Sequence, residues 1–242
     1  GLGADATNAA AVARIFAAKQ RPAFNPLISH VASADAAFAL GQKTPIAAAL
    51  ANAFWPGPLT LILQRNDDCP VTMLTTAGLD KIGVRVPAHC GAQTLLQAFG
   101  KPIAAPSANP SGRISPSTAK HVLDGLDGRL DLVLDGGSCE SGLESTIIDC
   151  SGKVARLLRP GGITRDALAA ALAVANCNPQ INIAEPLADH KNPVAPGQLA
   201  SHYAPRAAVR LMAKTSTAGE ELIGFGTVSG AGKLALNLSP SA

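Results

Sequence analysis

Residues 55–63 read Trp55-Pro56-Gly57-Pro58-Leu59-Thr60-Leu61-Ile62-Leu63, a proline-rich stop followed by an apolar run. Proline cannot continue a helix, so residues 55–58 predict the end of one helix and a turn. The run at 59–63 is too short for a helix and is bounded by turn residues, which indicates a buried strand. This stretch therefore predicts a helix, a turn and a strand of a largely buried sheet.

Short helices and strands continue to alternate on both sides of this stretch. Such interleaving indicates an α/β domain built around one sheet. Apolar spacing and capping residues predict helices at 5–19, with Asp5 or Thr7 as the cap, and at 33–41, 45–54, 91–99, 117–126 and 164–174. Strands are predicted at 27–31, 59–63, 82–86, 102–105, 131–134, 145–149 and 154–158.

The periodicity fades after residue 175, where proline recurs in an extended segment. We expect a catalytic domain at 1–175, a proline-rich linker or lid at 176–205 and the start of a small domain at 206–242. Strands are predicted in the last part at 207–212, 221–225 and 234–236, with little sequence after them to pack against. The small domain is therefore expected to be incomplete.

Composition narrows the class of protein. The 242 residues carry a net charge of +3 and only 3% aromatic residues, which is less than a dedicated nucleic-acid binder needs. No run approaches the roughly 18 apolar residues of a membrane span, so a soluble protein with no membrane partner is expected. The five cysteines are odd in number and contain no Cys-x-x-Cys pair, which fits a reducing cytoplasm.

Two cations stand where the first predicted helix ends. Lys19 and Arg21 are separated by one residue and lie beside Pro22. A lysine point charge and a planar arginine suit phosphate oxygens, although cations at a helix C-terminus also complement the helix dipole. Asn25 and His30 follow closely, and His30 on its own is better explained as a core histidine.

Small polar side chains follow several predicted strands. Residues 107–112, Ser107-Ala108-Asn109-Pro110-Ser111-Gly112, come after the strand at 102–105 and could approach an anion closely or form an ordinary polar turn. Ser145 and Thr146 open a strand, and Arg159 ends the next one. Neither a Walker A loop nor a Gly-x-Gly-x-x-Gly fingerprint is present, which argues against ordinary P-loop or dinucleotide chemistry.

Other catalytic constellations are weaker. Ser107, His121 and Asp149 have the residue types of a hydrolase triad, but the chain has no Gly-x-Ser-x-Gly elbow. The five histidines show no metal-ligand spacing. No metal-binding side chain is therefore predicted.

Six sequence blocks stand out along the chain. They are Lys19-Gln20-Arg21-Pro22 with Asn25-Pro26-Leu27, Trp55-Pro56-Gly57-Pro58-Leu59-Thr60, Gly83-Val84-Arg85-Val86-Pro87, Ser107-Ala108-Asn109, Ser145-Thr146-Ile147-Ile148-Asp149 and Arg159-Pro160-Gly161. In order and spacing, these blocks together resemble the YrdC-type threonylcarbamoyl-AMP synthase family. The resemblance covers roughly residues 1–170, and Pro196-Gly197-Gln198 with Ser201-His202-Tyr203-Ala204-Pro205 looks like the linker of the long two-domain form.

The resemblance implies a twisted mixed sheet with flanking helices, followed by a linker and an incomplete Rossmann-like domain. It also implies conversion of L-threonine, bicarbonate and ATP to threonylcarbamoyl-AMP and pyrophosphate, for tRNA threonylcarbamoyladenosine. Mg²⁺ is expected to bridge the phosphates. The partner would be tRNA or a downstream tRNA-modifying transferase. A Pro-Thr-Glu-Thr-Val-Tyr segment that contacts threonine would immediately precede Gly1, which puts the activity of this exact chain in question.

The resemblance also implies roles for individual residues. Lys19 and Arg21 would be catalytic. His30, Arg85, Ser107 and Ser145 would bind threonine and its carbamate. ATP would be bound by Arg21, Asn25, Lys81, Asn109, Ser117, Arg159, His202 and Tyr203.

Two other functions fit parts of the sequence. A carbamoyl-adenylating maturation factor contains a YrdC-like domain, but it adds acylphosphatase and zinc-finger modules that this sequence does not show. A non-catalytic module that binds double-stranded RNA or tRNA could use a basic concave face. Threonine-dependent pyrophosphate release separates the synthase from both.

Overall fold

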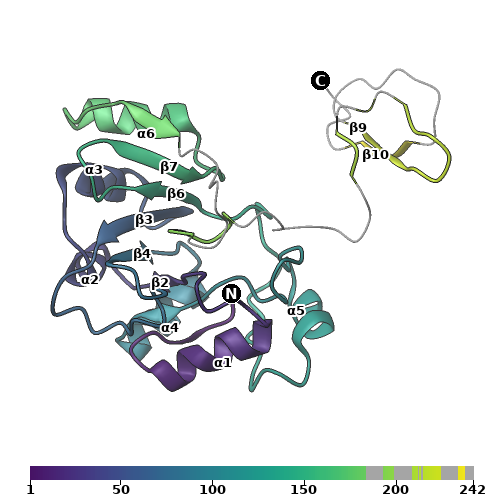
Figure 1. Ribbon diagram of the computed structural model, residues 1–242, viewed down its shortest axis with the longest axis horizontal. Helices are drawn as coiled ribbons and strands as arrows, with labels where there is room; N and C mark the ends of the chain where they lie inside the picture. Colours follow the sequence, from purple (N-terminus) through teal and green to yellow (C-terminus); the bar gives the residue numbers. More distant parts are fainter. Residues whose placement is uncertain (184–192, 199–208, 212, 214, 225–233, 238–242) are drawn as a thin grey trace. The chain divides into compact units, whose positions relative to one another are not determined.

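The structure is a computed structural model, and it describes residues 1–183, 193–198, 209–211, 213, 215–224 and 234–237 (Figure 1). The chain divides into two compact units, Gly1–Ala204 and Pro205–Ala242. The first unit contains the large sheet and all the described helices. The described helices are short, and none is both long and apolar enough to cross a membrane.

The sheet of the first unit has eight strands in the order β1-β5-β2-β4-β3-β6-β7-β8. Strand pairs β2–β4, β3–β6 and β7–β8 are parallel, and the remaining neighbours are antiparallel, so the sheet is mixed as predicted. The strands are β1 (Ala4–Asp5), β2 (Ile28–His30), β3 (Leu59–Gln64), β4 (Lys81–Arg85), β5 (Ile103–Ala104), β6 (Thr146–Asp149), β7 (Ala155–Arg159) and β8 (Ile181–Ile183).

The helices form close to the predicted positions. They are α1 (Ala9–Lys19), α2 (Ala34–Leu40), α3 (Pro45–Phe54), α4 (Cys90–Phe99), α5 (Ala119–Leu126) and α6 (Arg165–Val174). Helix α1 begins later than predicted because Asn8, rather than Asp5 or Thr7, accepts the free amides of the first turn. The Asp5 carboxylate is bonded instead to the amide and hydroxyl of Thr7.

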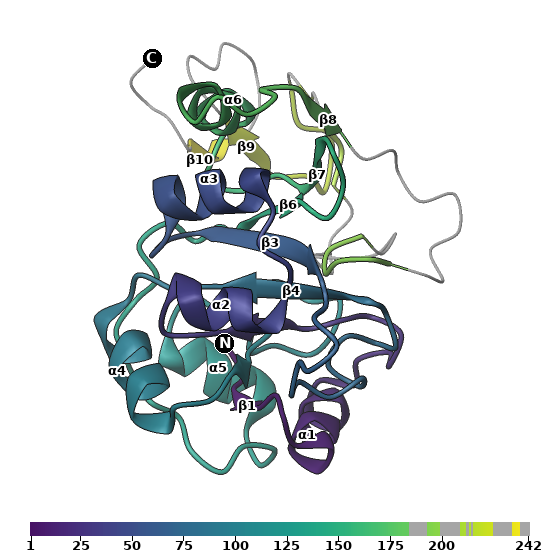
Figure 2. The same ribbon diagram turned by 90° about the vertical axis from the view of Figure 1, so that its left-hand side faces the viewer.

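The two faces of the sheet differ in what covers them. Helices α2 and α3 lie across one face, in front of β3 and β4 in Figure 2. Leu59, Leu61 and Leu63 point into the main core on that side, whereas Ile62 belongs to a separate small cluster. Because strand side chains alternate, Thr60 and Ile62 face the other side, which we call the site face.

The strand predicted at 131–134 does not form. Leu132 is 83% exposed and Leu134 is 72% exposed. Strand-forming composition is insufficient without a pairing partner, and no described strand pairs with this segment. Instead, Arg14 Nη2 of α1 donates to both carboxylate oxygens of Asp131 in this segment.

Strands β1 and β8 were not predicted, since they have only two and three residues, too few for a pattern to be recognised. Strand β8 lies within the predicted linker and pairs with β7. In the second unit, β9 (Leu222–Gly224) and β10 (Leu234–Asn237) form a parallel pair. A strand was also predicted at 207–212. Its described part, residues 209–211, does not form a strand.

Candidate active site

Strand register places several polar side chains in one row across the site face. His30 of β2 is the register partner of Arg85 of β4. On the next strands Thr60 is the partner of Ile147, and Ile147 is the partner of Arg159. Since register partners lie on the same side of a sheet, these residues share the face opposite α2 and α3.

The row concentrates positive charge. Burial, and then the nearby charge of Arg159, lowers the pKa of Arg85 below its usual range. Arg85 Nε donates to Gly57 O at 3.0 Å, which fixes the guanidinium beside the turn that precedes β3. Two guanidinium groups that face the same space favour an anionic ligand, because a carboxylate or phosphate relieves their repulsion.

His30 is neutral in this environment. Burial, followed by the charge of Arg85, lowers the pKa of His30 to about 3. Its Nδ1 is buried and makes no hydrogen bond to any described residue. A buried nitrogen without a partner is costly, so His30 is well placed to bond a ligand.

Ser145 connects the row to the turn before β6. The Arg159 guanidinium donates to Ser145 O at 2.9 and 3.1 Å and to Ser145 Oγ at 3.1 Å. Thr60 Oγ1 lies 2.7 Å from the same hydroxyl oxygen. Thr60 was not predicted as a site residue. The signal that could have identified it is a buried hydroxyl on an otherwise apolar strand.

Lys19 joins the end of α1 to the loop after β5. Its side chain is almost fully buried, and Nζ donates to the carbonyl oxygens of Ser107 and Asn109. The Ser111 amide donates back to Lys19 O at 2.8 Å. Burial, and then the charge of Arg21, lowers the pKa of Lys19 to about 7. The structure thus brings together the two polar loops that the sequence placed far apart.

Arg21 organises the loop between α1 and β2. Its guanidinium donates to Asn25 O at 3.1 Å, Asn25 Oδ1 at 2.7 Å and Pro26 O at 2.8 Å. Asn25 is completely buried, and its Nδ2 has no hydrogen-bond acceptor among the described residues. This amide is a second polar group available to a ligand.

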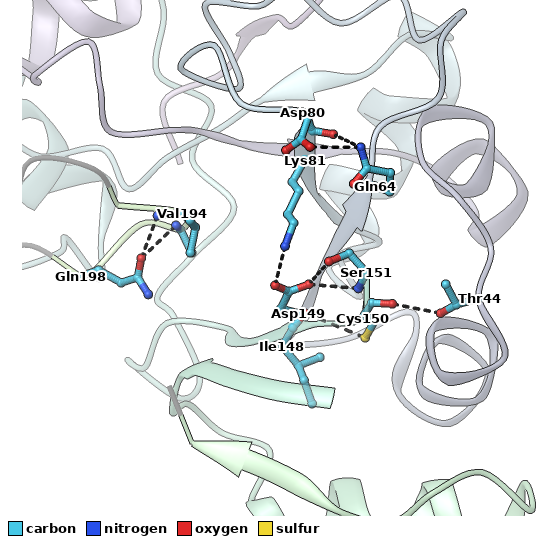
Figure 3. A network of polar contacts seen from close by, with 11 residues as sticks. Thr44, Gln64, Asp80, Lys81, Ile148, Asp149, Cys150, Ser151, Val194 and Gln198 are labelled. Carbon is cyan, nitrogen blue, oxygen red and sulfur yellow. Dashed lines mark hydrogen bonds and ion pairs between the residues drawn. The ribbon is translucent and has the colours of Figure 1, made fainter. Parts of the chain in front are cut away.

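Two predicted ATP-binding residues have other partners. Ser117 Oγ lies 3.2 Å from His121 Nδ1, beside the start of α5. Lys81 Nζ lies 3.0 Å from Asp149 Oδ2 (Figure 3). Lys81 is at the opposite end of β4 from Arg85, about 13 Å away at 3.3 Å per residue. His202 and Tyr203 lie outside the described residues.

The hydrolase alternative is not supported by these contacts. Asp149 is bonded to Lys81 and Ser151, while His121 is bonded to Ser117. These partners do not form the nucleophile, base and orienting carboxylate of a triad. Across the described residues, no three His, Cys, Asp or Glu side chains gather as a metal site would require.

Comparison with known proteins identifies the family. The profile of the family described as Telomere recombination (Sua5, YciO and YrdC) matches residues 1–161. A second profile, described as Threonylcarbamoyl-AMP synthase, C-terminal domain, matches residues 163–236. The first profile alone spans more than half of the chain.

Individual relatives agree with the profiles. The chain is 43% identical over 209 residues to a Bacillus subtilis protein named threonylcarbamoyl-AMP synthase, covering 86% of this chain and 58% of the relative. A Pyrococcus abyssi protein of the same name is 43% identical over 210 residues, covering 86% and 60%. The chain therefore spans about three fifths of the length of these curated relatives.

A solved structure shares the fold. The crystal structure of P. abyssi Sua5 complexed with L-threonine matches with a TM-score of 0.78 and 38% identity, covering 93% of this chain and 61% of that one. The mixed sheet and flanking helices are thus those of Sua5 structures. Sequence, fold and profile together place this chain in the Sua5/YciO/YrdC family.

Proposed function

We propose that this chain acts as an L-threonylcarbamoyladenylate synthase, a nucleotidyltransferase. Threonine's amine combines with bicarbonate to give a carbamate and water. A carbamate oxygen then attacks the α-phosphorus of ATP, and pyrophosphate leaves. The relatives named threonylcarbamoyl-AMP synthase support this assignment, as does the similarity to P. abyssi Sua5, which was crystallised with L-threonine.

One observation carries the proposal: strand register gathers His30, Arg85 and Arg159 on one face of the sheet. The reaction needs such a place, because carboxylate, carbamate and phosphate oxygens are all anionic. Preorganised cations stabilise the charge that develops when the carbamate attacks phosphorus. A neutral His30 can exchange a hydrogen bond with threonine without adding a further cation.

We assign threonine and its carbamate to the row and its neighbours. Arg85 would bind the carboxylate, while His30, Ser107 and Ser145 would orient the amine, the hydroxyl or the carbamate. The hydrogen bonds of Arg159 to Ser145 support this grouping, since they place a cation beside the predicted threonine site. The position between Arg85 and Arg159 would then hold the nascent mixed anhydride.

ATP is assigned to the neighbouring loops. Lys19 and Arg21 would contact phosphate oxygens as the catalytic cations, with Asn25, Asn109, Ser117 and Arg159 completing the site. The partnerless Nδ2 of Asn25 supports this, since an acceptor on the nucleotide would satisfy it. Lys81, His202 and Tyr203 remain proposed ATP contacts, and Lys81 would have to exchange its bond to Asp149 for one to nucleotide.

Mg²⁺ is proposed to arrive with ATP. The groups nearest the proposed phosphate site are cations, amides and hydroxyls, which suit phosphate oxygens better than a metal ion. Mg²⁺ keeps several waters and often binds through substrate phosphates, so it would neutralise the leaving pyrophosphate without a protein cage. A cytoplasmic location, and tRNA or a tRNA-modifying transferase as the downstream partner, complete the proposal.

The test is a pyrophosphate assay on the purified protein. Release that requires ATP, L-threonine and bicarbonate together, with threonylcarbamoyl-AMP found by mass spectrometry, is the expected result. Arg85→Gln should reduce this release by about 10²-fold or more, as loss of a preorganised charge stabiliser does. Arg165→Gln, an exposed arginine at the start of α6, is the matched control.

Other outcomes would replace the proposal. Dependence on carbamoyl phosphate instead of threonine would indicate a carbamoyl-adenylating maturation factor. Tight binding of double-stranded RNA or tRNA without any pyrophosphate release would indicate a binding module.

A further inference from the structure

A short turn late in the sequence packs on the site face against strands from much earlier in the chain. Residues 193–198 read Pro193-Val194-Ala195-Pro196-Gly197-Gln198, and we call them the proline turn. Pro193, Ala195 and Pro196 are buried, and Ala195 is completely inaccessible. A turn with three buried residues is anchored to the protein and not merely passing over it.

The anchor is a small apolar cluster on the site face. Ala195 packs with Ile28, Ile62, Ile147 and the partly buried Leu158. This cluster is separate from the main core behind the sheet. Between Ile28 and Ile62 the register places Gly83, and the side chains of the two isoleucines lie over it, since a Cβ there would stand 3.2 Å from Ile62 Cδ1 and 3.6 Å from Ile28 Cγ1.

One side chain holds the turn in shape. Gln198 Oε1 accepts hydrogen bonds from Val194 N at 2.9 Å and Ala195 N at 3.1 Å (Figure 3). Gly197 has a positive φ of 93°, which lets the chain turn back so that Gln198 reaches both amides. The amide oxygen therefore does for this turn what a capping side chain does for a helix end.

The proline turn lies next to the charged row. Ile147 belongs to both: it is a member of the same apolar cluster as Ala195, and it lies between Thr60 and Arg159 in the register. The cluster that anchors the turn is therefore a direct neighbour of the charged row.

Resting on the function proposed above, we infer that Gln198 is a positioning residue that fixes the proline turn as one wall of the reaction site. The wall restricts water beside the arginines where the mixed anhydride would form. Water exclusion matters there, because a threonylcarbamoyl–phosphate anhydride hydrolyses if water reaches it. Gln198 itself does not touch the reacting atoms.

The test compares two variants of Gln198, one of similar size without a hydrogen-bond acceptor and one that keeps an acceptor oxygen. Gln198→Leu has similar size but accepts no hydrogen bond, whereas Gln198→Glu retains an oxygen for both amides. Hydrogen exchange at Val194 and Ala195, measured without substrates, should become about tenfold faster in Gln198→Leu and stay near wild type in Gln198→Glu. Gln97→Leu, at an exposed position of α4, controls for the added apolar side chain.

The functional measurement is how much threonylcarbamoyl-AMP survives for each pyrophosphate that is released. In Gln198→Leu, the ratio of threonylcarbamoyl-AMP retained to pyrophosphate released should fall about fivefold, with AMP appearing from hydrolysis, and Gln198→Glu should restore it. A purely structural role would lower all rates together without changing this ratio. Unchanged exchange, or faster exchange with an unchanged ratio, overturns the inference. If the wild-type protein releases no threonine-dependent pyrophosphate, the proposed function fails, while the exchange result still reports on the turn.

Discussion

Lys81 Nζ lies 3.0 Å from Asp149 Oδ2, and this ion pair joins β4 to β6 across the intervening β3. The Asp149 side chain is only 6% exposed, and its other oxygen accepts from the amide and hydroxyl of Ser151. The contact gives Lys81 a structural partner that the sequence did not indicate. A nucleotide phosphate would have to compete with this carboxylate.

We expect Lys81→Met to destabilise the protein by about 1–2 kcal/mol, since it leaves a buried carboxylate with fewer partners. The effect should depend on pH. Burial tends to raise the pKa of Asp149, but the bonds from Ser151 and Lys81 outweigh it, so the pKa lies below 3.8. Stability from this group is therefore present above about pH 3.8 and is lost as pH falls through the lowered folded-state pKa.

In the variant the pKa of Asp149 should rise, so acid unfolding should begin at a higher pH than in the wild type. Chemical unfolding followed by circular dichroism between pH 3 and 8 checks this. Lys153→Met, at an exposed loop position, should change neither quantity. Equal acid-unfolding profiles for Lys81→Met and wild type would show that the pair contributes nothing.

Arg159→Ala should weaken ATP binding about 5- to 150-fold, the equivalent of about 1–3 kcal/mol for a lost charge-assisted contact. The same change removes the hydrogen bonds that position Ser145, so threonine affinity should also fall. Calorimetric titration with each substrate measures both. Arg165→Ala is the control. If Arg159→Ala binds nucleotide as tightly as the wild type does, Arg159 does not contact ATP.

Lys19 should make ATP binding sensitive to pH near neutrality. Its pKa is lowered to about 7, so the unliganded protein loses this positive charge as pH rises through that value. Phosphate binding favours the protonated form and raises the pKa, hence binding above pH 7 should take up a proton. Titrations in buffers of different ionisation enthalpy detect that proton.

The matched variant is Lys19→Met. Protonation of ATP itself contributes equally to both proteins, so the difference between them isolates Lys19. Wild-type affinity should fall more steeply than that of Lys19→Met between pH 6 and 9. Parallel curves would mean that Lys19 does not contact the nucleotide.

Thr60→Val should impair threonine use without affecting ATP affinity. The change keeps the shape of the side chain but leaves the buried Ser145 hydroxyl without its 2.7 Å partner, at a cost of about 1 kcal/mol. We expect KM for threonine to rise about fivefold, and Thr60→Ser to restore it. An unaltered KM in steady-state assays of Thr60→Val would show that this bond has no role in the threonine site.

The sequence predicted much of the fold because the elements that formed have strong local signals. Pro56 and Pro58 stop a helix, and Leu59, Leu61 and Leu63 form a strand wherever a sheet is available. The segment at 131–134 has a similar local pattern but forms no strand, because pairing depends on a partner that local sequence does not specify.

The sequence by itself determined the family and the kinds of side chain available for the site, through motif order and local patterns. Tertiary structure alone decided which of them meet. Strand register aligned His30 with Arg85 and Ile147 with Arg159, and burial made Lys19 titrate near neutrality. The fold also pairs Lys81 with Asp149 in an ion pair. Residues distant in sequence become neighbours only through sheet pairing and side-chain alternation, and desolvation acts only once the chain is folded.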